Sequence, residues 1–148
     1  MIIREVGLDE KTLALLIGFS EDWAAENSCY GYRPNEKSDI EGNKIFLAEE
    51  GRVVGYLFGK VYPSKQMQSI MPEGTPYFEV EELYVVPERR SRGIGMKLFR
   101  YAEEVVKAEA EYMVLSTATK NWKAIFHFYL DELDMTFWSA RLFKKIEK

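Results

Sequence analysis

The most constraining feature of the sequence is a change of hydrophobic period between Tyr77 and Val106. Residues 77–86 are rich in β-branched and aromatic side chains, which favours a strand, and Pro87 ends it. Beyond a basic turn, the apolar residues follow a helical spacing, at Ile94, Leu98, Phe99, Ala102, Val105 and Val106. The pattern predicts a strand, a turn that contains two glycines, and an amphipathic helix.

This turn has the physical properties of an anion-binding site. The first turn of a helix presents backbone N–H groups without partners inside the helix, and the helix dipole places positive partial charge at the same end. Gly93 and Gly95 let the backbone approach an anion closely. The basic residues nearby are Arg89, Arg90, Arg92, Lys97 and Arg100. We therefore expect a phosphate group to bind here.

Two common phosphate-binding patterns do not fit the spacing of the glycines. A P-loop needs four residues between its glycines, followed by Lys and Ser or Thr, whereas here the glycines are two apart and Met96 follows. A dinucleotide-binding fingerprint needs a third glycine where this chain has Leu98. On the turn alone, the ligand stays open, and a helix cap with solvated arginines remains an alternative.

The remaining elements predict a single α/β domain over residues 1–148, a usual length for one domain. An apolar stretch opens the chain, Asp9 has the character of a helix N-cap, and two apolar runs around Gly51 predict a β-hairpin. The later elements expected are a strand at 112–115, a helix at 121–130, and strands at 137–138 and 140–143. The order β-α-β-β-β-α-β-α-β-β predicts a mixed sheet with helices on both faces.

The strand over residues 77–86 has an apolar pattern that changes parity. Phe78 and Val80 are apolar at even positions, whereas Leu83 and Val85 are apolar at odd positions. A β-bulge between the two pairs would keep all four side chains on one face of the sheet. The alternative is a central strand that is buried on both faces and needs no bulge.

Composition and charge exclude several classes of function. The net charge of −4 does not favour a nucleic-acid partner, and no apolar run reaches the ~18 residues that span a bilayer. The single cysteine, Cys29, forms no internal disulfide, so we expect a cytoplasmic protein. Residues 1–88 hold 8 basic and 16 acidic side chains, and residues 89–148 hold 12 and 8. This split fits two differently charged ligand regions, or an accident of surface composition.

The run Leu-Tyr-Val-Val-Pro-Glu-Arg-Arg-Ser-Arg-Gly-Ile-Gly from Leu83 to Gly95 resembles the acetyl-CoA-binding motif of the GNAT superfamily of N-acetyltransferases. That motif is Arg/Gln-x-x-Gly-x-Gly/Ala after a strand, and the order of elements is similar over nearly the whole chain. The resemblance implies a mostly antiparallel sheet of about seven strands, whose central strands splay to form a CoA cleft. It also implies acetyl-CoA as co-substrate and an amine acceptor as partner.

The resemblance assigns roles to particular residues. The turn amides that would hold the CoA pyrophosphate belong to Arg90, Ser91, Arg92, Gly93, Ile94 and Gly95, with Met96 beginning the helix. The strand residues that would lend backbone groups to the pantetheine arm are Leu83, Tyr84 and Val85. Such groups are available where a bulge leaves the main chain unpaired.

A later family motif, Asn-x-x-Ala-x-x-x-Tyr, is matched at Asn121 and Ala124, which adds these residues to the expected cofactor site. The position of the tyrosine holds Phe128, and Tyr129 follows one residue later. In similar enzymes this tyrosine protonates the departing CoA thiolate. A local π-type bulge would bring Tyr129 into line; otherwise the position belongs to Phe128, which donates no proton.

An amine nucleophile must lose a proton, because most amines are protonated at pH 7, so a base is needed. Three carboxylates, on Glu79, Glu81 and Glu82, lie on the strand beside the expected thioester. Similar enzymes often place the base at the position of Glu81, so we expect Glu81 first and Glu79 second. A solvated acidic patch is the alternative.

Other chemistry is not indicated by the remaining candidates. His127 is more typical of packing or surface than of a proton relay, one Cys and one His do not predict a nucleophilic pair, and metal ligands are lacking. Two alternatives to N-acetyl transfer remain: a non-catalytic acyl-CoA-binding domain, and a transferase for another acyl group. The aromatic C-terminus predicts either a homodimer edge or part of the core.

Overall fold

A computed structural model describes all residues 1–148, and its centre is a mixed sheet of five strands in the order β1-β2-β3-β4-β5. The strands are β1 (Ile2–Val6), β2 (Lys44–Glu50), β3 (Arg52–Pro63), β4 (Pro76–Val85) and β5 (Tyr112–Val114). Neighbours are antiparallel except β4 and β5, which are parallel. The mostly antiparallel α/β sheet predicted from the sequence is confirmed.

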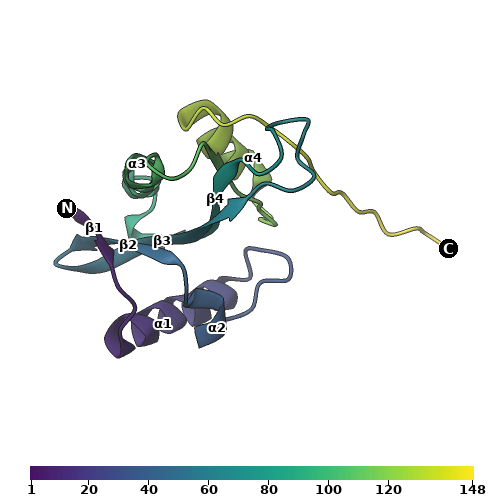
Figure 1. Ribbon diagram of the computed structural model, residues 1–148. Helices are drawn as coiled ribbons and strands as arrows, with labels where there is room; N and C mark the ends of the chain where they lie inside the picture. The colour runs from purple at the N-terminus through teal and green to yellow at the C-terminus, as the bar shows by residue number, and fades with distance from the viewer.

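Helices cover both faces of this sheet (Figure 1). They are α1 (Glu10–Glu26), α2 (Lys37–Ile40), α3 (Ile94–Val106) and α4 (Trp122–Phe126), with a 3-10 turn η1 (Pro87–Arg89) and a π-helical turn η2 (His127–Glu132). The helices α1 and α2 lie on one face, and α3 and α4 lie on the other. Asp9 caps α1 as predicted, since its carboxylate accepts a 2.7 Å hydrogen bond from the N–H of Thr12. None of the helices has the length and apolar character to span a bilayer.

Two apolar layers hold the helices on the sheet. The α3 stripe predicted from the helical period is buried, at Ile94, Leu98, Phe99, Ala102 and Val106. On the opposite face, the ring of Phe19 from α1 lies 5.9 Å from the rings of both Tyr56 and Tyr84. Burying each such side chain contributes about 1.5–3 kcal/mol, so both helices are fixed firmly against the strands that carry the site.

The bulge predicted in β4 is present at Glu81. Phe58 of β3 pairs with Glu82, and the next residue, Gly59, pairs with Val80, which leaves Glu81 without an opposite residue. A side chain at Gly59 would clash, because its Cβ would lie 2.2 Å from the carbonyl oxygen of Glu79. The bulge brings Val80 and Leu83 to the α3 face together, and it therefore resolves the change of parity in the sequence.

The predicted number of seven strands is wrong, because the structure has five. The two strands expected around Phe137-Trp138 and residues 140–143 do not form, and from residue 134 onward the chain contains neither strand nor helix. This tail leaves the body of the molecule (Figure 1), and the side chain of Leu142 is 94% exposed. The apolar pattern of this segment is typical of a strand, but a strand also needs an edge to pair with, and the tail meets none within its own chain.

Candidate active site

The turn between β4 and α3 presents an unbroken run of free backbone donors. The N–H groups of residues 91–96 donate no hydrogen bond within the protein. Two residues of the turn have left-handed backbones, Ser91 with φ of 63° and Gly93 with φ of 81°. Alternation of left-handed and helical residues directs successive N–H groups into one concavity, which is an arrangement that binds anions. The turn therefore presents six free donors at the position where the sequence predicts a phosphate site.

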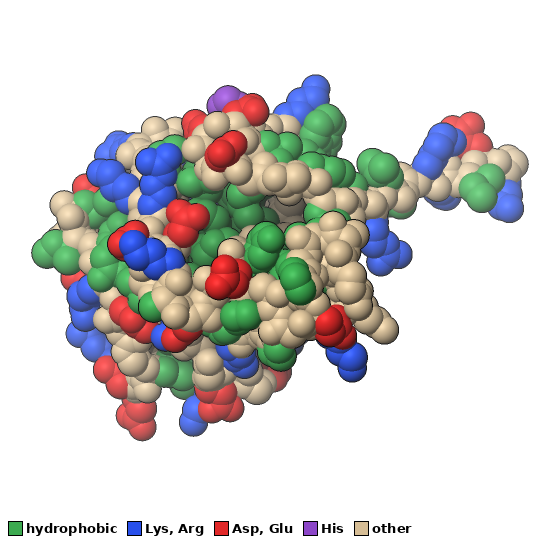
Figure 2. Space-filling view, turned by 45° about the horizontal axis from the view of Figure 1, so that its top comes forward, with side chains coloured by type: hydrophobic (Ala, Val, Ile, Leu, Met, Phe, Trp, Pro, Cys, Tyr) green, Lys and Arg blue, Asp and Glu red, His purple; other side chains and the backbone are tan.

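Arg90 differs from the residues that follow it. Its N–H donates to the carbonyl oxygen of Pro87 at 3.3 Å, so its amide does not join the free run. Its guanidinium forms an ion pair with Glu26 at 2.7 Å. By contrast, Arg92, Lys97 and Arg100 form no ion pair in the structure. Figure 2 shows a face of the molecule on which basic side chains stand beside an apolar recess.

The strands β4 and β5 separate soon after they meet. They pair only through Tyr77–Glu79 of β4, and beyond that point β4 has an open side. The N–H of Val86 donates to Val54 of β3, so the alternation of an antiparallel strand directs the backbone groups of Leu83 and Val85 to the open side. Those of Tyr84 point to β3 instead. Of the three strand residues expected to bind the pantetheine arm, Leu83 has both backbone groups free on this side, and Val85 has only its N–H free, because its carbonyl oxygen accepts a hydrogen bond from Arg90.

The chain that leaves β5 bonds to the loop after α1 instead of to β4. The N–H of Tyr30 donates to Ala118 and the N–H of Lys120 donates to Ser28, at 2.9 and 2.8 Å. Cys29 and Thr119 form an isolated β-bridge between these bonds. These contacts hold the two segments together across the end of the sheet. They also give hydrogen-bond partners to backbone groups of the segment after β5, which no longer pairs with β4.

The turn that follows α4 is π-helical, which is the geometry needed to bring Tyr129 to the position of the family tyrosine. The π-helical turn η2 contains both Phe128 and Tyr129. The ring of Phe128 faces the phosphate turn, since a Cβ on Gly95 would lie 3.4 Å from its Cζ. Asn121 precedes α4 as its N-cap and Ala124 lies within α4, both exposed. The segment thus brings one aromatic ring to the turn and sends the next into the protein.

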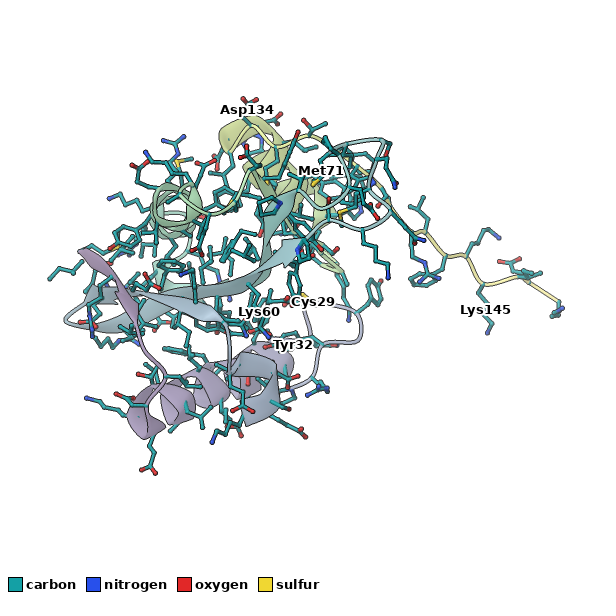
Figure 3. The ribbon with its side chains drawn as sticks, viewed as in Figure 1. Cys29, Tyr32, Lys60, Met71, Asp134 and Lys145 are labelled. Carbon is teal, nitrogen blue, oxygen red and sulfur yellow. The ribbon has the colours of Figure 1, made fainter.

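Tyr129 lies in a mostly buried position beside the loop after α1. Burial, with a smaller contribution from the nearby Cys29, raises the pKa of its phenol to about 12. Its hydroxyl makes no hydrogen bond within the protein. A phenol of this kind stays protonated across the physiological range and has its proton free to donate. Cys29 and Tyr32 lie on the same loop, below the sheet in Figure 3.

The bulge gathers three carboxylates on the α1 face of β4. Residues opposite each other in an antiparallel pair share a face, and Glu82 pairs with Phe58 while Glu79 pairs with Lys60. The bulged Glu81 joins them, because its carboxylate accepts a 3.2 Å hydrogen bond from the hydroxyl of Tyr62. In an unbroken strand Glu82 would point to the opposite face from Glu79.

Glu82 is occupied by structural contacts. Its Oε1 atom accepts hydrogen bonds from Tyr56 at 2.7 Å, Asn35 at 3.0 Å and Tyr32 at 3.2 Å. Burial raises the pKa of Glu82, while these three donors oppose the rise. The carboxylate therefore ties the loop over residues 28–36 to β4.

Glu79 is the carboxylate of β4 whose pKa is raised to near neutral pH. Burial raises its pKa to about 7, and the charge of Glu81 adds to the rise. Glu79 accepts no side-chain hydrogen bond, in contrast to Glu82. A half-buried carboxylate that titrates near neutral pH has the properties of a general base.

Some residues of the site were not identified from the sequence. Tyr62 and Glu26 lie far from the motifs in the chain, and only the pairing of strands and the packing of α1 bring them close. Their residue types carry no periodic signal. His127 is exposed and pairs with Asp131 at 2.9 Å on the outer side of η2, away from the carboxylates of β4. No cluster of three or more His, Cys, Asp or Glu side chains is placed to hold a metal ion.

Comparison with known protein families identifies the class of the chain. The sequence model of the acetyltransferase (GNAT) family matches residues 14–132, well over half of the chain, and the chain therefore belongs to this family. The resemblance inferred from residues 83–95 is confirmed. A comparison with curated proteins finds no match.

Solved structures with similar folds include several acetyltransferases. The aminoglycoside N-acetyltransferase AAC(6')-Iy in complex with CoA shares 16% identity, with 99% of this chain and 100% of that chain covered and a TM-score of 0.65. The same enzyme with a bisubstrate analogue, CoA-S-monomethyl-acetylneamine, shares 13% identity with both chains fully covered and a TM-score of 0.67. A putative acetyl transferase from Pyrococcus furiosus shares 17% identity over 98% of this chain and 100% of that chain, with a TM-score of 0.68. At these identities the likeness establishes the fold.

Proposed function

We propose that this acetyltransferase uses acetyl-CoA to acetylate a primary amine of a small molecule or peptide by direct transfer. The observation that carries the proposal is the run of six free N–H groups at residues 91–96, next to a strand with an open side. A diphosphate needs several converging donors, and the turn supplies them without any side-chain rearrangement. Crystallised neighbours that hold CoA support the choice of ligand.

In this proposal, the cofactor lies along the open side of β4. The pyrophosphate accepts from the amides of Ser91, Arg92, Gly93, Ile94, Gly95 and Met96. The backbone groups of Leu83 and the N–H of Val85 contact the pantetheine arm, and Phe128, Asn121 and Ala124 line the other wall from α4 and η2. The thioester then lies near the bulge, where the carboxylates gather.

The acceptor amine approaches from the α1 face of β4. Glu79 takes a proton from the ammonium group, directly or through water, and the neutral amine attacks the thioester carbonyl. A carbon–nitrogen bond forms, while backbone donors of β4 stabilise the oxyanion. The nitrogen then loses its second proton to water as the carbon–sulfur bond breaks. Glu81 lies beside Glu79 and favours a cationic acceptor at the same point. We place the base at Glu79 ahead of Glu81, because Glu81 is already held by Tyr62.

Tyr129 is the proposed acid that returns a proton to the departing thiolate. Its high pKa keeps the phenol protonated, and its hydroxyl has no competing partner within the protein. Phe128 is one residue away and packs at the turn, so in this proposal it binds the cofactor and takes no part in proton transfer.

The wider setting is also part of the proposal. We place the chain in the cytoplasm as a single domain over residues 1–148, without a nucleic-acid or membrane partner. The exposed tail favours a homodimer, since Leu142, Phe143 and Ile146 are 94%, 79% and 72% exposed in the single chain. Exposed apolar groups of this size mark an interaction surface more often than free solvent contact.

The experiment is a turnover assay with acetyl-CoA across a panel of primary amines, followed by mass spectrometry of each amine. A mass gain of about 42 Da in at least one amine is the expected result, because an acetyl group replaces one hydrogen of the amine. CoA binding without transfer to any amine would favour the non-catalytic alternative. Transfer only from a larger acyl-CoA would favour a different acyl donor.

A further inference from the structure

Arg90, the first residue of the cofactor motif, is joined to the end of α1. Its terminal nitrogens donate to the two carboxylate oxygens of Glu26 at 2.7 and 2.9 Å. Its Nε donates to the carbonyl oxygen of Val85 at 2.8 Å. A bidentate arginine–carboxylate pair has a fixed geometry and is stronger than a single charged contact. The guanidinium is therefore held at three points before any ligand binds.

Glu26 makes a second contact that locks the pair against β4. Its Oε2 atom accepts a 3.0 Å hydrogen bond from the hydroxyl of Tyr84, and the guanidinium of Arg90 lies 5.3 Å from the centre of the same ring. The Glu26 side chain is only 21% exposed. Solvent screens a partly buried ion pair less than a fully exposed one. The contact therefore fixes Arg90 to the end of α1.

The backbone conformation of the residue after Arg90 explains why Arg90 must be held in place. Ser91 has a φ of 63°, a left-handed conformation that costs free energy in a residue with a side chain. Such a conformation persists where the surrounding structure holds it. Arg90 is anchored on the near side of Ser91, and the buried Ile94 anchors α3 on the far side. The two anchors fix the bend that directs the free N–H groups.

We propose that Glu26 is a positioning residue for the cofactor: it holds Arg90, and through Arg90 it holds the turn in its anion-binding shape. Arg90 then contributes geometry to the site, and the positive charge for phosphate comes from the unpaired Arg92, Lys97 and Arg100. This inference rests on the proposed function, because it takes residues 91–96 as the cofactor site.

The Glu26–Arg90 ion pair also connects the cofactor turn to the loop after α1. Glu26 is the last residue of α1, and the next residue, Asn27, accepts a 3.1 Å hydrogen bond from Lys120. One turn earlier on α1, Trp23 packs between Tyr32 and Tyr84, with ring centres 4.5 and 5.2 Å away. Tyr32 itself bonds to Glu82. The cofactor turn and the acceptor side of β4 thus share one rigid support.

A competing arrangement makes the opposite prediction. If Arg90 leaves Glu26 and binds phosphate directly, Glu26 competes with the ligand for the guanidinium. Neutralising Glu26 would then free Arg90 and tighten CoA binding. If Glu26 positions the turn, the same change loosens the turn and weakens CoA binding. The sign of the change in affinity therefore separates the two.

The experiment is calorimetric titration of CoA into the wild type, Glu26→Gln, Arg90→Gln and the double variant. Glu21→Gln, an exposed change five residues earlier on α1, is the matched control. The expected result is a loss of affinity of roughly tenfold in each single variant and about the same in the double variant, since coupled residues are not additive. In steady state, KM for acetyl-CoA rises while kcat at saturation changes little. Circular dichroism checks that each variant is folded.

Each outcome has a separate meaning. Unchanged or tighter binding in Glu26→Gln, or fully additive losses in the double variant, would overturn the positioning role while leaving the CoA site intact. Failure of the wild type itself to bind CoA would overturn the proposed function instead. A Glu21→Gln variant that loses as much affinity as Glu26→Gln would show a general charge effect and would also overturn the positioning role.

Discussion

The hydroxyl of Tyr56 donates a 2.7 Å hydrogen bond to Oε1 of Glu82, and this contact separates the three glutamates of β4 by role. Tyr56 is fully buried, so its hydrogen bond holds the carboxylate of Glu82 against the side chains packed between β3 and α1. Glu79 and Glu81 stay on the accessible side of the same face. One bulge thus produces a structural carboxylate and a pair of carboxylates available for chemistry.

Removing the Tyr56 hydroxyl should therefore affect stability more than cofactor binding. In Tyr56→Phe, Glu82 keeps its other two donors but loses the shortest bond. We expect the free energy of unfolding to fall by ~1–3 kcal/mol, because a buried charged acceptor is left less well satisfied. Urea denaturation measures this change. An unchanged midpoint would contradict the structural role of Glu82, and KM for acetyl-CoA serves as the control that should stay constant.

The pH dependence of turnover should report the ionisation of Glu79. Its pKa is raised to about 7, so the carboxylate is protonated at pH 5.5 and becomes an effective base as pH rises through 7. We expect kcat/KM to climb over this window in the wild type. Glu79→Gln should lower kcat/KM by roughly 10²–10⁴-fold and remove the limb near pH 7.

The matched control for Glu79 is Glu81→Gln. It removes a neighbouring charge that raises the pKa of Glu79, so the limb should move to lower pH and persist. If Glu81→Gln abolishes the limb and Glu79→Gln keeps it, the base is Glu81 and the present assignment is reversed.

Tyr129 should matter for the breakdown of the thioester. We expect Tyr129→Phe to lower kcat by about 10²-fold with little change in affinity for CoA, because the ring is kept and only the proton donor is lost. Phe128→Leu is the comparison, since Phe128 packs at Gly95; it should raise KM for acetyl-CoA and leave kcat nearly unchanged. Equal effects of the two changes on kcat would argue against a separate acid.

The C-terminal tail gives a prediction on assembly. Leu142 and Phe143 are almost free of contacts with the body, apart from the edge-to-face packing of Phe143 on Tyr30 at 5.4 Å. Lys145 lies further along the tail in Figure 3. A Leu142→Glu, Phe143→Glu double variant should stay folded and shift a dimeric wild type to monomer in light scattering. Ile2→Glu, at the opposite end of the sheet, is the control. A monomeric wild type would contradict the homodimer.

The sequence predicted those features of the fold that depend on the spacing of residues within one segment. The stripe on α3, the cap at Asp9 and the bulge near Glu81 all follow from spacing within one segment, and all are present. The cofactor motif also lies within one segment. The strand expected at Phe137 failed because pairing depends on a distant or separate edge, which no spacing encodes.

The finer features of the site depend on contacts between distant segments. Glu26 meets Arg90 across 64 positions of the chain, and Tyr62 meets Glu81 only because β3 and β4 pair in one register. Sequence reasoning placed Glu81 ahead of Glu79 as the base. The order is reversed in our proposal because burial, which no residue type reveals, falls more heavily on Glu79.

The most direct test of the central claim is calorimetric titration of CoA into the wild type and Gly95→Glu. A Cβ at Gly95 points into the space between Phe128 and Val85, 3.4 and 3.9 Å from their nearest atoms, so a glutamate side chain would place negative charge in the pyrophosphate site. Gly95→Ala is the control with a small side chain. The account predicts a loss of affinity of about 100-fold or more in Gly95→Glu, equivalent to ~2.7 kcal/mol, and a much smaller loss in Gly95→Ala. A folded Gly95→Glu variant that binds CoA as tightly as the wild type would contradict it.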